Sequence, residues 1–238
     1  MKTYKIFPLN LGYITRPKKN FFFGYQGTEV EDFPVIAYYL EGEHKILVDN
    51  GGCAVDAPRG VAAQPYTRTK EQEIDNALRA IGVEPEEIEF IIFTHLHWDH
   101  ASNTNLFPNA RLICQKREFE SLDEPNNPSN KKGYIKEYVQ KYTYEFVEGD
   151  VDLFDGISVM LTPGHTIGSQ SVIVQMEEGP AIITGDLITL RESWEHNPPQ
   201  PNGLYYNDDA LEMMYESIEK LRPVSKLIFP GHDGCVFK

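Results

Sequence analysis

The 238-residue chain is poor in cysteine and has no long apolar run. Cys53, Cys114 and Cys235 lie far apart and form no C-x-x-C pair, so we expect reduced thiols in a cytoplasmic protein. No stretch approaches the roughly 18 apolar residues of a transmembrane helix, which argues against a membrane partner. The opening residues, MKTYKIFPLN, also lack the apolar segment of a signal peptide.

Basic residues are scarce as well. The chain has 22 Lys and Arg residues against 36 Asp and Glu, which gives a formal net charge of -14. A surface this negative repels phosphate backbones, so we expect no nucleic-acid partner. It favours a small-molecule substrate that is neutral or cationic. The oligomeric state stays open between a monomer and a homodimer.

Hydrophobic residues make up 41% of the chain, enough for a real core. Helical periodicity predicts long helices over 70–81 and 208–221, and shorter ones over 116–122 and 134–142. Apolar runs bounded by turn residues predict strands at 35–40, 45–50, 89–94, 111–114, 157–162, 170–176, 181–186 and 226–231. Short strands interspersed with helices predict an α/β fold in which two sheets are covered by helices.

Three segments have the composition of loops: 51–68, 123–133 and 187–207. Loops of this length are often rims or lids of functional sites. The third contains Trp194, His196, Tyr205 and Tyr206, residue types that commonly surround a small, partly apolar ligand. The alternative is an ordinary surface excursion.

The most informative stretch is His95-Leu96-His97-Trp98-Asp99-His100, directly after the predicted strand 89–94. Residues two apart in extended chain point the same way, so His95 and His97 can converge on one metal ion. Asp99 and His100 are neighbours that diverge, and they can serve a second ion. This spacing differs from the helical H-E-x-x-H pattern.

Three further ligand-type residues end predicted strands. His165 and His232 each follow a Pro-Gly pair, and Asp186 follows Thr184-Gly185. If these junctions share one edge of the fold, they join the first four residues in one cluster. The alternative is a set of ordinary hydrogen-bonded side chains, which we expect for His44 in its predicted turn.

Imidazole and carboxylate ligands suit zinc, and also iron or manganese. Two divalent ions lower the pKa of a shared water, and the resulting hydroxide can attack a carbonyl. Asp186 lies outside the histidine-rich stretch, so it is the natural candidate to bridge both ions.

H-x-H-x-D-H with a downstream PGH, a GD and a final GH resembles the metallo-β-lactamase superfamily. The resemblance runs from VIAYYLEGEHKILVDNGG to FPGHD. It implies a four-layer αββα sandwich, with residues 1–238 as a single domain and the metals at one edge of the sheets. By motif match, the first metal is bound by His95, His97 and His165, and the second by Asp99, His100 and His232, with Asp186 bridging.

Within that superfamily the chain is similar to N-acyl-homoserine lactonases, through HLHWDH, TPGHTIGSQS and FPGHD. This implies that hydroxide opens a lactone ring and that Asp99 protonates the leaving alkoxide. One residue departs from the pattern. The lactonases carry a substrate-polarising Tyr three residues after the bridging Asp, where this chain has the shorter Thr189. Tyr205 or Tyr206 is a candidate to replace that Tyr.

Other reactions stay open. The same two-metal machinery can act on a thioester, a cyclic amide, or a phosphate or sulfate ester. An iron-dependent oxidoreductase is a further alternative. A protein that only binds a ligand is disfavoured, because it has no need of so many metal-ligand residues.

Overall fold

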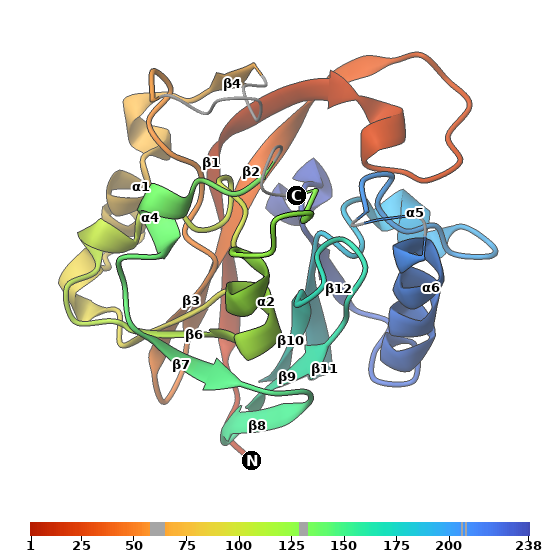
Figure 1. Ribbon diagram of the computed structural model, residues 1–238. Coiled ribbons are helices and arrows are strands. Elements are labelled where there is room, and N and C mark those ends of the chain that lie inside the picture. Colours follow the sequence, from red (N-terminus) through yellow and green to blue (C-terminus); the bar gives the residue numbers. More distant parts are fainter. Residues whose placement is uncertain (58–64, 129–132, 206, 208) are drawn as a thin grey trace.

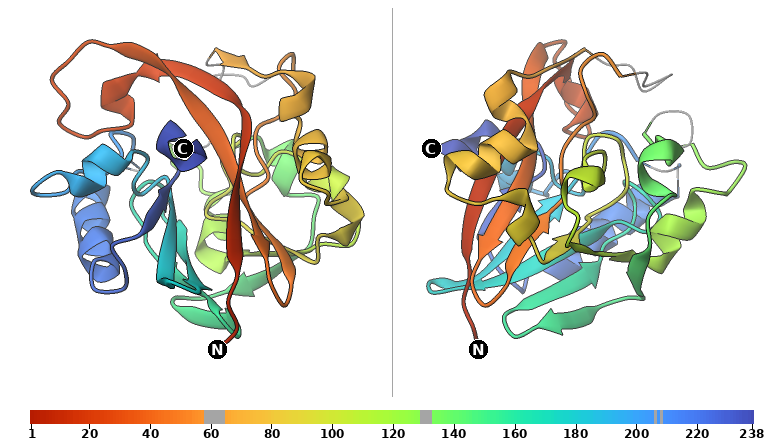
Figure 2. Two further views of the ribbon diagram at one scale, coloured as in Figure 1. Left: turned by 180° about the vertical axis from the view of Figure 1, so that it is seen from behind. Right: turned by 90° about the vertical axis from the view of Figure 1, so that its left-hand side faces the viewer.

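Two β-sheets pack face to face at the centre of the computed structural model, with helices outside them (Figure 1). The structure describes residues 1–238 except 58–64, 129–132, 206 and 208. The view from behind in Figure 2 shows the same order, with α1 on one side and α6 on the other. The predicted αββα sandwich is therefore confirmed.

The larger sheet holds seven strands within the described residues. In spatial order they are β4 (Tyr66–Thr67), β1 (Lys5–Pro17), β2 (Val30–Glu41), β3 (Lys45–Val48), β5 (Phe90–Ile92), β6 (Arg111–Gln115) and β7 (Tyr144–Val147). The five-stranded sheet runs β12 (Ile228–Pro230), β11 (Gly179–Gly185), β10 (Gln170–Met176), β9 (Ile157–Leu161) and β8 (Val151–Phe154).

Strand β2 shows how one sequence serves two cores. Alternate residues of a strand point to opposite faces of the sheet. Tyr38 and Leu40 belong to the core between the sheets, together with Val172 of β10. Ala37 and Tyr39 belong to the outer core under the helices. Burial on both faces explains why residues 33–40 read as a continuous apolar run.

The helices cover the outer faces. α1 (Ile74–Ala80), α2 (Lys116–Ser121) and α4 (Lys136–Val139) lie on the side of the larger sheet, and α5 (Arg191–Glu195) and α6 (Ala210–Leu221) on the side of the smaller one (Figure 1). Met214, Ile218 and Leu221 of α6 pack on Ile182 and Ile228. Short 3-10 turns complete the chain: η1 (Lys18–Asn20), η3 (Lys70–Gln72), η4 (Pro85–Glu87), η5 (Thr104–Leu106) and η6 (Gly234–Phe237).

All eight predicted strands are present, and the hairpin of residues 35–50 pairs β2 with β3 in antiparallel register. Four strands were not predicted: β1, β4, β7 and β8. Pro8 and Gly12 interrupt the apolar pattern of β1, and Gly12 has φ +113° beside a shift in register. The segment 70–81 is only partly α-helical, because Glu73 is extended between η3 and α1. α5 lies within the segment 187–207 that was expected to be a loop.

Strand direction brings the motifs together. β3, β5 and β6 are parallel, so their carboxyl ends share one edge of the larger sheet. β9 and β11 both run antiparallel to β10, and β12 runs parallel to β11. The carboxyl ends of β9, β11 and β12 therefore share one edge of the smaller sheet. The loops after β5, β9, β11 and β12 therefore meet at one edge of the sandwich. None of the described helices is long and apolar enough to cross a membrane.

Candidate metal centre

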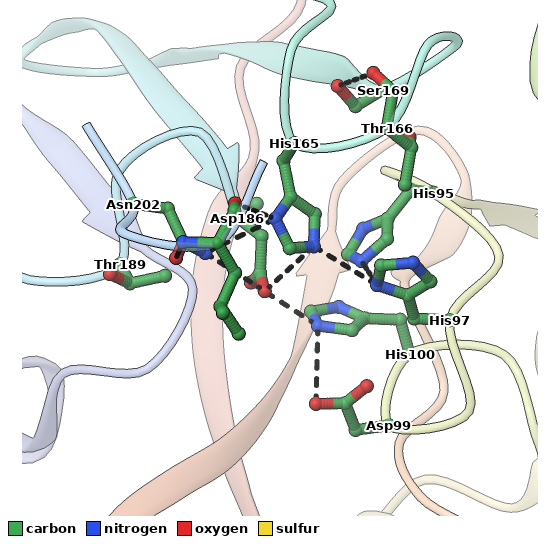
Figure 3. Close-up of polar contacts among 12 residues, drawn as sticks. His95, His97, Asp99, His100, His165, Thr166, Ser169, Asp186, Thr189 and Asn202 are labelled. Carbon is green, nitrogen blue, oxygen red and sulfur yellow. Dashed lines mark hydrogen bonds and ion pairs between the residues drawn. The ribbon is translucent and has the colours of Figure 1, made fainter. Parts of the chain in front are cut away.

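The structure brings the seven predicted ligand residues into one cluster. Figure 3 labels His95, His97, Asp99, His100, His165 and Asp186 of this cluster. Three overlapping groups of ligand atoms form within it, and in each the atoms lie within 4.8 Å of one another. The groups are His95, His97 and His165; His95, His100 and Asp186; and Asp99, His100 and His232. The first and last match the two ligand sets that the sequence motif implies.

The first group is a cage of three imidazoles. Nε2 of His95 and Nε2 of His165 each lie 3.0 Å from Nδ1 of His97. Burial lowers the pKa of His95 and His97 well below the ordinary value, and it lowers the pKa of His165 too. These rings are therefore neutral at pH 7, and their lone pairs are available to a cation.

Asp186 joins the two groups. Its Oδ1 lies 3.3 Å from Nε2 of His100 and 3.2 Å from Nε2 of His232. Its Oδ2 lies 3.3 Å from Nε2 of His165. One oxygen thus faces each group, which is the arrangement of a bridging ligand. Asp99 completes the second group, with Oδ2 3.8 Å from Nε2 of His232.

The unsatisfied atoms of the cluster fit a metal. Nε2 of His100, Nε2 of His232 and Oδ1 of Asp186 are all buried without a hydrogen-bond partner. Buried polar atoms normally find a partner, because leaving one unpaired costs about 1–3 kcal/mol. A divalent cation at the second group satisfies all three together, so the donor set fits two metal ions.

Hydrogen bonds on the far side of two of the rings fix their orientation. Nδ1 of His232 donates to the carbonyl of Pro34 over 2.7 Å, and Nδ1 of His165 donates to the carbonyl of Leu204 over 2.8 Å. Each bond leaves Nε2 facing the cluster, as is common for metal-binding histidines. Gly231 lets the chain pass close by, since a Cβ there would lie 2.6 Å from Oδ1 of Asp186.

Asp49 supports the second group from behind. Its carboxylate accepts hydrogen bonds from Nδ1 of His100 and from the backbone N–H of Thr94, both at 2.8 Å. Burial opposes the charged form of His100, but Asp186, Asp49 and Asp99 outweigh it and raise the pKa of that ring. Asp49 itself has φ +61°, at the turn that follows β3.

Glu118 of α2 supports the first group. Its buried carboxylate accepts hydrogen bonds from the N–H of Leu96 and the hydroxyl of Tyr134 through Oε1. Oε2 accepts from the hydroxyl of Thr166 and the N–H of Gly168. The ring of Tyr134 in turn packs on His97, with centroids 5.0 Å apart. One carboxylate therefore ties together the loops after β5 and β9.

The candidate substrate residues are more scattered. Thr189 is fully buried, and its hydroxyl donates to the carbonyl of Phe21 over 2.5 Å. Trp194 lies in the hydrophobic cluster beneath α6. His196 is exposed and packs edge-on against Phe22. Tyr205 is partly buried against the same cluster as Trp194. Tyr206 lies outside the described residues.

Sequence reasoning missed the residues that hold the ligands. Asp49 lies near the end of the predicted strand 45–50, much as Asp186 ends the predicted strand 181–186, and that placement could have revealed it. Glu118 and Asn202 carry no such signal. The side-chain nitrogen of Asn202 lies 3.5 Å from Oδ2 of Asp186, and the residue is fully buried. His44 bonds Glu89 and packs on Phe90, far from the cluster, as expected.

Fold and ligand cluster together define a class of protein. The model of the metallo-beta-lactamase superfamily matches residues 30–232, and the chain belongs to that superfamily. An N-acyl homoserine lactonase from a Bacillus species is 34% identical over 227 residues, covering 87% of this chain and 86% of the relative.

Solved structures agree with this placement. A variant of AiiA from B. thuringiensis, solved with N-decanoyl-L-homoserine at its active site, has a TM-score of 0.81 and 28% identity, covering 98% and 95% of the two chains. An N-acyl homoserine lactone hydrolase, solved with the product N-hexanoyl-L-homoserine at its catalytic metal center, has the same TM-score, identity and coverage.

Proposed function

We propose that the protein is a two-metal hydrolase that opens the ring of a small lactone. The observation that carries the proposal is the position of Asp186, with one oxygen toward each group of ligand-type residues. Its relatives support the lactone as the substrate class, since they are N-acyl homoserine lactonases. All cluster residues come from one chain, so the site needs no second copy.

We assign His95, His97 and His165 to one ion, Asp99, His100 and His232 to the other, and Asp186 to both. When bound, two divalent cations acidify water and polarise the lactone carbonyl. Zinc is the proposed metal because the donors are imidazole and carboxylate, and iron or manganese are the alternatives. No disulfide joins the cysteines in the described part of the chain, which supports our proposal of a cytoplasmic location.

Asp99 is the proposed proton carrier. Its side chain is 10% exposed, so it reaches the open side of the cluster while Oδ2 stays near His100 and His232. A carboxylate there can take a proton from the attacking water and deliver it to the ring oxygen as the ester bond breaks. The ring oxygen becomes a neutral hydroxyl group, and one hydroxy acid forms from the lactone and one water.

Substrate contacts are assigned to the segment 187–207. Tyr205 is the best-placed member, because it follows Leu204, whose carbonyl holds His165. We propose that Tyr205 takes the polarising role for which Thr189 is too short. Trp194 packs beneath the segment in the cluster under α6. His196 and Tyr206, the latter outside the described residues, complete our proposed substrate set.

A panel of lactones tests the proposal. Purified protein loaded with zinc is expected to open at least one lactone, detected as the hydroxy acid by liquid chromatography and mass spectrometry. His97→Ala, which removes one ligand, is the control. The lactone proposal fails if no ring opening exceeds that control. Parallel panels of thioesters, cyclic amides, and phosphate and sulfate esters, with oxygen consumption by the iron-loaded protein, then identify the alternative reaction.

A further inference from the structure

Arg16 lies near the carboxyl end of β1, on the face of the strand that also carries Ile14. Side chains two residues apart on a strand point the same way. Ile14 is fully buried in the cluster that contains Trp98 of the H-x-H-x-D-H loop. The neighbouring Thr15 points outward, where its hydroxyl donates to exposed Asp32. Arg16 therefore shares the face of Ile14.

Ring contacts place the guanidinium beside the ligands. Cζ of Arg16 lies 5.8 Å from the centroid of the Phe21 ring, and that ring lies 4.8 Å from the ring of His232. The ring of Phe21 thus connects Arg16 to His232 of the second ligand group.

Arg16 has no acceptor within the described part of the chain. Its Nε is buried without a hydrogen-bond partner. Arg79 and Arg111, by contrast, each bond carboxylates, although both are more exposed. Glu31 lies directly opposite Arg16 on β2, yet the two side chains form no ion pair. In a chain with a net charge of -14, a half-buried guanidinium without an ion pair among the described residues is unexpected. A buried polar group left unsatisfied costs about 1–3 kcal/mol.

We propose that Arg16 is a specificity-determining residue that binds an oxygen acceptor on the substrate, outside the ring that is opened. The inference rests on the proposed lactonase function and names the substrate class more closely: lactones with a carbonyl or carboxylate on their substituent. The planar guanidinium suits such oxygens because it offers several donors in a fixed fork. The positive charge of Arg16 favours a substrate with an oxygen acceptor at this position, whereas the net charge of the whole chain alone suggests a neutral or cationic substrate.

Three lactones of matched chain length test the inference: an alkyl lactone, an acyl-amide lactone and a lactone with a carboxylate on its substituent. Arg16→Met keeps an apolar stem over Phe21 but removes the donors. We expect kcat/KM to fall about 10- to 100-fold for the oxygen-bearing lactones, the range of a hydrogen bond to a charged group. The alkyl lactone should change less than about twofold, and Arg16→Lys should fall in between.

Lys19→Met is the matched control, since it removes an equal charge from an exposed position three residues away. Whichever of the two oxygen-bearing lactones loses more under Arg16→Met identifies the acceptor. An equal loss on all three lactones, or no loss on any, overturns the assignment of Arg16.

A binding measurement separates this inference from the lactone proposal. The zinc-loaded protein is titrated with a ring-opened N-acyl homoserine, and its melting temperature is recorded. If the wild type opens no lactone but Arg16→Met weakens this binding, the lactone proposal fails and Arg16 keeps its role. If both proteins bind equally, the role of Arg16 is refuted whatever the reaction.

Discussion

The carboxylate of Glu118 accepts a hydrogen bond from the backbone N–H of Leu96, the residue between His95 and His97, over 2.9 Å. Its second oxygen accepts from Thr166, the residue after His165, over 2.7 Å. The two ligand loops belong to different sheets, and they share this one buried acceptor. The geometry of the first ligand group therefore depends on a residue that binds no metal itself.

Glu118→Gln should weaken the first ligand group. An amide nitrogen cannot accept a hydrogen bond, so either Leu96 and Tyr134 or Thr166 and Gly168 lose their acceptor. Changes behind metal ligands typically cost about 10- to 100-fold in affinity or activity, and we expect a loss in that range. Zinc affinity by competition with a chelator, and kcat/KM, measure it.

Glu120→Gln is the matched control, because Glu120 lies exposed on the same helix. It should leave both quantities unchanged. If Glu118→Gln bound zinc as tightly as the wild type, the loops would keep their geometry without this carboxylate.

Asp186→Asn should separate the two sites. The side chain of asparagine has one oxygen instead of two, so only one of the two ligand groups keeps an oxygen ligand from this position. We expect the metal content to fall from two ions toward one per chain and the activity to fall by about 100-fold or more. Elemental analysis after gel filtration measures the first quantity. Asp123→Asn, whose side chain is 74% exposed, serves as control.

The ligands could be predicted because they end or follow apolar strands and because five of the seven are histidines, of which the whole chain has seven. The residues that support the ligands could not be predicted, because contacts between distant parts of the chain determine which residues these are. Glu118 is one acidic residue among 36, and only packing shows that it is buried with four donors.

Aromatic composition predicts the substrate segment but not how its side chains pack. Trp194 packs in the cluster beneath α6, and its role at the substrate stays a prediction. Arg16 gave no signal at all, because β1 itself was not predicted. The direction of a side chain on an unrecognised strand cannot be inferred from alternation.

Acidification should destabilise the metal-free protein below about pH 6.5. Burial lowers the pKa of His95, His97 and His165 in the fold, relative to the value of 6.5 that applies on unfolding. Below that pH the unfolded chain binds more protons than the folded one, so stability rises with pH and is lost as pH falls. Each histidine contributes at most about 1.4 kcal/mol per pH unit.

Two groups have shifts in the other direction. Below pH 6.5, His100 is protonated in both the folded and the unfolded chain, so it adds no pH dependence to the free energy of unfolding there. The pKa of Glu118 is raised in the fold, so the folded chain binds up to one more proton than the unfolded chain, and acidification stabilises the fold through this group. Urea unfolding of chelated protein between pH 5 and 7.5 measures the balance. A free energy of unfolding that stays flat or rises on acidification would contradict the neutral state of the three rings.

Gly133→Ala should disturb the first ligand group by adding a single methyl group. A Cβ built on Gly133 would overlap the imidazole of His97, and Tyr134 packs on the same ring, so His97 has little room to move. Overpacking of this kind costs about 1–3 kcal/mol, and here part of that cost falls on a ligand. We expect zinc affinity and kcat/KM to fall by about 10-fold or more. Gly234→Ala, where an added Cβ meets nothing within 4 Å, should change neither, and equal behaviour of the two variants would show that His97 can shift without loss of the metal.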